Sequence, residues 1–156
     1  MPHRNVRRVV AAAEQLGLEI EIREFPEGTR TAAEAAAAIG VEVGQIVKSL
    51  VFGHGDAVVL ALVSGANQLD ESALSAVAGG GDVGRVDADR VRQATGYPIG
   101  GVPPFGHAER LETFVDEHLL TFHEVWAAAG TWHHVFGLAP AELVRATGGT
   151  VAHLAR

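Results

Sequence analysis

Cysteine is absent from the 156-residue chain. Disulfide bonds, thiolate metal sites and cysteine nucleophiles are therefore excluded, and we expect a cytoplasmic protein. Long hydrophobic runs are absent as well. None approaches the roughly 20 residues that a membrane-spanning helix needs, so no membrane partner is expected. Although the N-terminal stretch is basic and then apolar, Glu14 and Gln15 interrupt it, which favours an amphipathic helix over a signal peptide.

Positive charge is scarce. Twelve Lys and Arg residues stand against 19 Asp and Glu residues, which gives a net charge of −7. This balance argues against a protein that binds along the backbone of DNA or RNA, but it leaves contact with the end of an RNA open. Two local basic clusters, Arg4/Arg7/Arg8 and Arg85/Arg90/Arg92, are most simply solvated helix faces, and their role stays open.

The local pattern alternates irregularly between helices and strands. Helices are predicted over residues 5–16, 29–40, 70–80, 87–96, 125–130 and 140–149, and strands over 18–25, 45–52, 57–64, from 111 onward and over 133–139. Residues 81–86 are predicted as a short strand or a loop. A Gly-rich turn joins the second and third strands into a hairpin. The length suits a single domain over residues 1–156. This order favours an α+β class with a mixed, strongly curved sheet and helices packed outside.

Lys48 is the single lysine of the chain, and the other eleven basic residues are arginines. It lies in the apolar stretch QIVKSLVF, and both faces of this predicted strand look largely buried. Burial of an unpaired ammonium is costly, so Lys48 needs a carboxylate, carbonyl groups or an anionic or polar ligand. Because the chain uses arginine elsewhere, a functional compact ammonium is favoured over a lysine that merely reaches solvent from the strand end.

A loop rich in glycine and proline, IGGVPPFGH, occupies residues 99–107. Gly100 and Gly101 let the backbone approach a ligand, whereas the two prolines stiffen the loop. Such a loop forms either an oxyanion-type site or an ordered connection, and the residues alone do not decide between them. His107, which closes the loop, is a candidate for a hydrogen bond to a ligand.

No nucleophile or metal motif stands out. The histidines lack zinc-site spacing, and Ser64 in LVSGAN does not lie in a G-x-S-x-G elbow. We therefore expect no metal and no other cofactor; a metal hydrolase would have to use Asp116, His118 and His123. The remaining enzymatic option is hydrolysis by a positioned water or by the substrate's own hydroxyl, with the protein supplying geometry and charge.

Four stretches together, VGQIVKSLVF, LVSGANQLD, TGYPIGGVPPFGH and VDEHLLTFHEVWAAAG, resemble the YbaK/ProX-type aminoacyl-tRNA deacylases. This family is related to the editing domain inserted in bacterial prolyl-tRNA synthetases. The resemblance implies a mixed, barrel-like sheet surrounded by helices. It also implies a free-standing trans-editing hydrolase that meets the acceptor end of mischarged aminoacyl-tRNA and cleaves its ester, with tRNA-Pro carrying a wrong small amino acid as the suggested substrate.

The same resemblance implies site residues. Lys48 would bind the ester carbonyl or nearby phosphate oxygens, and the backbone N–H groups of Gly100 and Gly101 would steady the developing oxyanion. The candidate substrate-binding residues are Thr31, Ser64, Pro103, Gly106, His107 and Asp116. An alternative from another class is a non-catalytic module that holds aminoacyl-tRNA ends or a small acyl ligand in the same pocket. The amino acid removed and the oligomeric state stay open.

Overall fold

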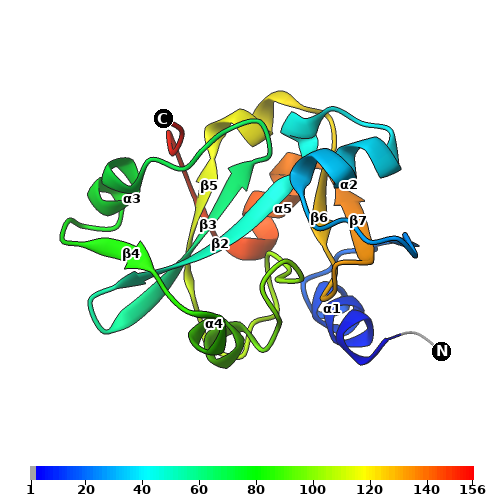
Figure 1. Cartoon of the computed structure of the whole chain (residues 1–156), viewed down its shortest axis with the longest axis horizontal. Coiled ribbons are helices and arrows are strands. Elements are labelled where there is room, and N and C mark those ends of the chain that lie inside the picture. The colour runs from blue at the N-terminus through cyan, green and yellow to red at the C-terminus, as the bar shows by residue number, and fades with distance from the viewer. Residues whose placement is uncertain (1–2) are drawn as a thin grey trace.

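Two separate β-sheets organise the fold in the computed structural model, which describes residues 3–156 (Figure 1). The smaller sheet has the order β1–β7–β6, with β1 at Ile22–Glu24, β6 at Val125–Ala128 and β7 at His134–Leu138. The larger has the order β4–β2–β3–β5–β8, with β2 at Val47–His54, β3 at Ala57–Ser64, β4 at Val83–Arg85, β5 at Glu112–Asp116 and β8 at Thr150–Ala152. Within the described range, no helix combines the length and apolar character needed to cross a bilayer.

The larger sheet is mixed. β2 and β3 form the predicted antiparallel hairpin, in which Lys48 lies opposite Val63, whereas β5 runs parallel to both β3 and β8. The α+β class is therefore confirmed. The barrel-like description needs correction, because the sheets do not close: over the described residues a single isolated bridge, Ile46 to Trp126, joins the start of β2 to β6. The short edge strands β1 and β4 pair over only three residues each, which leaves both sheets open.

Helices pack around the two sheets as predicted (Figure 1). They are α1 (Arg4–Gln15), α2 (Ala32–Ile39), α3 (Glu71–Val77), α4 (Ala88–Thr95) and α5 (Pro140–Thr147), with 3-10 turns η1 (Val43–Gln45) and η2 (Glu117–Thr121). The Thr31 hydroxyl caps α2 by accepting a hydrogen bond from the Glu34 N–H at 3.1 Å. Asp70 and Asp87 cap α3 and α4 in the same way. These local caps explain why the helix starts could be located from sequence.

Three elements differ from the local prediction. Residues 125–130, predicted as a short helix, instead contain strand β6. Val125 and Ala127 are buried while Trp126 and Ala128 are half-buried, and this alternation with pairing to β7 outweighs the helix propensity of alanine. β1 is shorter than predicted, because its pairing with β7 covers only three positions. β8 is not predicted at all, since only its parallel neighbour β5 makes it a strand.

The glycine- and proline-rich loop is anchored in the main hydrophobic core. Tyr97 is fully buried, and Val102 and Phe105 are almost so. Their side chains belong to the same core cluster as Val9 of α1 and Phe136 of β7. Because apolar side chains fix the loop at three points, its glycine backbone is held at a defined place next to β2.

Candidate functional site

An uncovered edge of β2 is the starting point of the site. β3 pairs with β2 along its full length, but on the opposite side β4 pairs only with Phe52–His54. Beyond the bridge at Ile46, the described chain places no strand against residues 47–51 on that side. An unpaired strand edge presents backbone N–H and C=O groups that a ligand can use.

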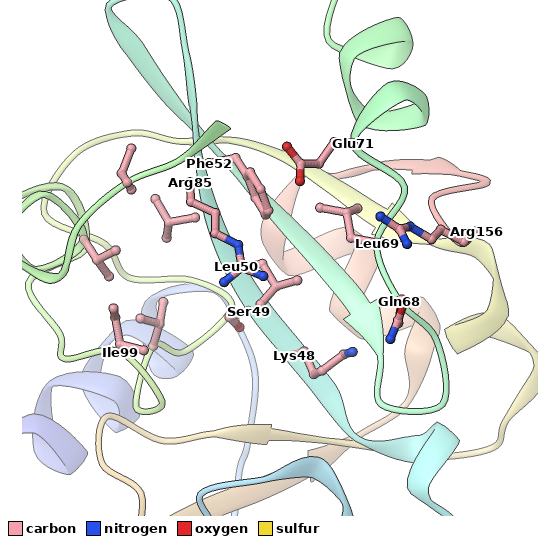
Figure 2. A pocket seen from close by; sticks show the side chains of 14 residues that line it. Lys48, Ser49, Leu50, Phe52, Gln68, Leu69, Glu71, Arg85, Ile99 and Arg156 are labelled. Atoms are coloured by element: carbon pink, nitrogen blue, oxygen red, sulfur yellow. The ribbon is translucent and has the colours of Figure 1, made fainter. Parts of the chain in front are cut away.

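Two cavities lie along this edge and meet at Lys48. The first, of about 450 Å³, is bounded by β2, the start of α3, β4 and the Gly/Pro loop (Figure 2). The second, of about 310 Å³, is bounded by β2, the start of α2, β6 and the same loop. We call them the α3 cavity and the α2 cavity. Their shared lining consists of Lys48, Ser49, Leu50, Ile99 and Val102.

Lys48 is half-buried, and within residues 3–156 its ammonium has one hydrogen-bond partner. The Nζ donates a hydrogen bond to the backbone carbonyl of Asn67. Burial lowers the pKa of Lys48, and the negative charge of Asp116 offsets part of this by raising it. β2 is less covered than its apolar sequence suggests, since residues 48–51 are all half-buried. An ammonium has three donors, so two remain for a ligand at the junction of the cavities.

Asp116 is 1% exposed and organises the turn that follows β3. Its Oδ2 accepts hydrogen bonds from the Ser64 N–H at 3.1 Å and the Asn67 side-chain amide at 3.0 Å, and its Oδ1 accepts from the His118 N–H at 3.1 Å. The fully buried Ser64 hydroxyl donates to the Gly44 carbonyl at 2.7 Å. Neither side chain lines the α2 or α3 cavity. Both hold the turn that carries the carbonyl partner of the lysine.

The two adjacent glycines of the loop have different surroundings. Gly100 lines the α2 cavity at a φ of +88°, and a Cβ there would approach the Trp132 ring to 3.0 Å. The Gly101 N–H donates to the Pro98 carbonyl at 2.9 Å, and a Cβ on Gly101 would lie 2.8 Å from the Gly130 carbonyl oxygen. Of the two N–H groups suggested for an oxyanion, only that of Gly100 lacks a partner within residues 3–156.

The other candidate binding residues divide in the same way. Thr31 lines the α2 cavity. Pro103 is buried and lines neither cavity, while Gly106 and His107 face a separate depression beside α5. The His107 ring donates from Nε2 to the Pro103 carbonyl at 2.7 Å. Of these four residues, Thr31 therefore lines the α2 cavity, and the other three belong to the Gly/Pro loop away from both cavities.

We expect His107 to make folding stability fall in mild acid. Burial lowers the pKa of His107 below its ordinary value of 6.5, although the hydrogen bond to Pro103 partly raises it. Between the lowered pKa and 6.5, the unfolded chain binds more protons, so the free energy of unfolding rises with pH, by at most about 1.4 kcal/mol per pH unit. His107→Gln keeps a donor and should flatten this slope in denaturant titrations between pH 5 and 7. An unchanged slope in His107→Gln would contradict the assignment.

Three residues of the site were missed by sequence reasoning. Ser49 lines both cavities, and its buried hydroxyl has no hydrogen-bond partner in the described chain. Its position directly after Lys48 was the only available signal. Arg85 and Arg156 line the α3 cavity, although Arg156 lies 71 positions after Arg85 and 108 positions after Lys48 in the chain. No local pattern connects residues so far apart.

Trp132 fixes the loop from outside. Its indole N–H donates a hydrogen bond to the Ile99 carbonyl at 3.2 Å. The Arg30 guanidinium lies over the Trp132 ring in a cation–π contact, 4.0 Å from the ring centroid. Arg30 and Ile99 both line the α2 cavity. The tryptophan thus ties the Gly/Pro loop to the segment before α2, so the two walls of this cavity are held together.

The metal-hydrolase alternative relied on Asp116, His118 and His123. In the structure Asp116 accepts a hydrogen bond from the backbone N–H of His118, and the His118 ring packs against Phe122. Over residues 3–156, no three side chains of His, Asp, Glu or Cys gather in a way that could hold a metal ion. The geometry gives this alternative no ligand set.

Comparisons with known proteins identify relatives of this chain. The aminoacyl-tRNA editing domain family matches residues 26–146. The chain is 35% identical over 130 residues to the uncharacterised protein YwhH of Bacillus subtilis, covering 83% of this chain and 82% of YwhH. It is 28% identical over 131 residues to EbsC of Enterococcus faecalis, named as a candidate Cys-tRNA(Pro)/Cys-tRNA(Cys) deacylase, covering 83% and 80%. A crystal structure of a candidate trans-editing enzyme for prolyl-tRNA synthetase superimposes with a TM-score of 0.95 at 45% identity, covering 100% of this chain and 99% of the other.

These matches confirm the resemblance expected from the motifs. The region matched by the family includes Lys48, the Gly/Pro loop and Asp116, which the fold brings to one place. The near-complete superposition extends the likeness to both sheets and their helices. The chain belongs to the aminoacyl-tRNA editing domain family.

Proposed function

We propose that this protein is a free-standing trans-editing hydrolase that acts in the cytoplasm on the acceptor end of mischarged aminoacyl-tRNA. The suggested substrate is tRNA-Pro that carries a wrong small amino acid. One observation carries the proposal: the partly desolvated ammonium of Lys48 stands where two cavities meet on an uncovered strand edge. The names of EbsC and of the superimposed structure support the reaction class and the tRNA.

The two cavities suit the two halves of such a substrate. The α2 cavity, of about 310 Å³, is the smaller of the two and its walls include Ala32, Ala35 and Ala127, so we assign the aminoacyl group to it. The larger α3 cavity then receives the terminal nucleoside. In this arrangement the ester that links them lies beside Lys48, as a positioned reaction requires.

The chemistry follows from the groups at that junction. The Lys48 ammonium and the Gly100 N–H would stabilise the negative charge that develops on the ester carbonyl oxygen when water attacks. Among the described residues, Glu71 is the only carboxylate that lines either cavity, and no histidine lines them. We therefore assign the positioning of the water to the ribose 2′-hydroxyl of the substrate. The C–O ester bond breaks, and the products are the free amino acid and the tRNA with its terminal hydroxyl.

The same shortage of a side-chain base favours a second candidate, a module that binds aminoacyl-tRNA ends without cleaving them. Lys48 and both cavities would serve this role equally well. Single-turnover hydrolysis with enzyme in excess separates the two candidates, because a binding module would protect the ester rather than shorten its lifetime.

We expect a panel of aminoacyl esters on tRNA-Pro to show faster hydrolysis of small groups than of a leucyl group. Alanyl, cysteinyl, seryl and threonyl esters fit the α2 cavity, whereas each methylene too many costs roughly 10- to 200-fold in kcat/KM. Equal rates for leucyl and alanyl esters would contradict the assignment of the α2 cavity.

Hydrolysis rates should not change after dialysis of the protein against a strong chelator. Loss of activity that zinc restores would contradict the metal-free mechanism.

A further inference from the structure

The α3 cavity carries an excess of positive charge. Three basic side chains, Lys48, Arg85 and Arg156, line it, against one carboxylate, that of Glu71. Three cations minus one anion leave a local charge of +2, in a chain whose net charge is −7. Concentration of positive charge in a hollow of an acidic protein indicates an anionic ligand.

The two arginines of this cavity are unpaired in the part of the chain that the structure describes. Within residues 3–156, neither guanidinium makes a hydrogen bond or ion pair, whereas Arg90 of the same basic cluster as Arg85 pairs with Glu109 at 3.0 Å. Figure 2 shows the two side chains reaching into the cavity from opposite sides, Arg85 from β4 and Arg156 from the chain segment beside Leu69. The backbone holds both positions, since Arg85 pairs opposite Phe52 of β2 and the Arg156 N–H donates to the Gln68 carbonyl at 3.0 Å.

We propose that Arg85 and Arg156 bind phosphodiester groups of the single-stranded 3′ end of the RNA, on the 5′ side of the terminal nucleoside. This inference rests on the proposed function, because the ester beside Lys48 directs the attached strand into the α3 cavity. A planar guanidinium matches phosphate with two parallel hydrogen bonds, which a lysine cannot do. Recognition limited to a few phosphates also explains how an acidic protein binds RNA.

The test compares Arg85→Gln and Arg156→Gln with Arg92→Gln, a matched control. Arg92 lies in the same basic cluster and is exposed on α4, but it lines neither cavity. Each variant is assayed on mischarged tRNA and on the corresponding aminoacyl-adenosine, which has the ester but no phosphate. We expect the first two variants to raise KM for the tRNA roughly fivefold at 0.1 M salt, as loss of one single-strand phosphate contact predicts, with kcat unchanged. Because aminoacyl-adenosine lacks the phosphates, the same two variants should raise its KM much less than that of the tRNA, and Arg92→Gln should equal the wild type on both.

A binding measurement keeps this inference separate from the proposed hydrolysis. Fluorescence anisotropy with an uncharged acceptor-stem hairpin ending in a single-stranded 3′ terminus needs no turnover. The slope of log affinity against log salt should become shallower by about 0.7 in each of the two variants and stay unchanged in Arg92→Gln. Equal slopes in all three variants, or an equal loss on aminoacyl-adenosine, would overturn the phosphate contacts. Absence of hydrolysis together with the altered slopes would overturn only the proposed reaction.

Discussion

Lys48→Ala should lower kcat/KM for a mischarged tRNA about a hundred- to a thousandfold. The loss corresponds to roughly 3–4 kcal/mol of transition-state stabilisation, the usual effect of removing one donor to an oxyanion. Stability should hold, because burial disfavours the charged form of Lys48 in the folded state and its removal relieves that cost. Rates and melting curves measured on the same preparation check both parts of this expectation.

Lys48→Arg is the sharper form of this test. A guanidinium keeps the positive charge but is larger and planar, and it directs its donors differently. Beside Ser49 and Leu50 it would crowd the ester, and a displacement of about 1 Å can cost on the order of a hundredfold in rate. We therefore expect arginine to rescue little of the alanine defect. Near-native deacylation by a folded Lys48→Arg protein would show that charge alone suffices.

Asp116→Asn should destabilise the protein and also reduce activity, by about 2–3 kcal/mol and on the order of a hundredfold. The two carboxylate oxygens accept from three donors on different sides, and the single oxygen of an amide cannot replace them. The NH₂ group would face at least one donor, and the turn bearing Asn67 would move. Because that turn supplies the carbonyl that holds Lys48, misplacement of the ammonium follows.

A pH profile separates this positioning role of Asp116 from general damage to the fold. The negative charge of Asp116 raises the pKa of Lys48, so its loss should lower that pKa further. In the proposed mechanism the ammonium is the active form, so the alkaline limb of the rate profile should then begin at a lower pH. Asp56→Asn, an exposed change of the same charge in the β2–β3 turn, should leave stability within about 0.5 kcal/mol and leave the profile unmoved. An alkaline limb that stays in place in Asp116→Asn would contradict the coupling to Lys48.

Much of the fold follows from short-range features. Thr31, Asp70 and Asp87 bond to N–H groups two or three residues further on, so the starts of α2, α3 and α4 were readable from sequence. The hairpin of β2 and β3 was also readable from sequence, because a Gly-rich turn separates two strand-like runs. β6 and β8 were not, because a short strand is defined by its neighbour, and those neighbours come from elsewhere in the chain.

The sequence by itself determined the family and drew attention to Lys48. A single lysine in an apolar strand and a glycine- and proline-rich loop are local and distinctive, and both lie at the site. The tertiary structure decided which groups around Lys48 line the two cavities. Gly101 proved to pack on the Gly130 backbone, Ser64 and Asp116 proved to support a turn, and Arg85 and Arg156 proved to line the α3 cavity. The reason is physical: burial, hydrogen-bond satisfaction and cavity walls depend on segments far apart in the chain, and only packing brings those segments together.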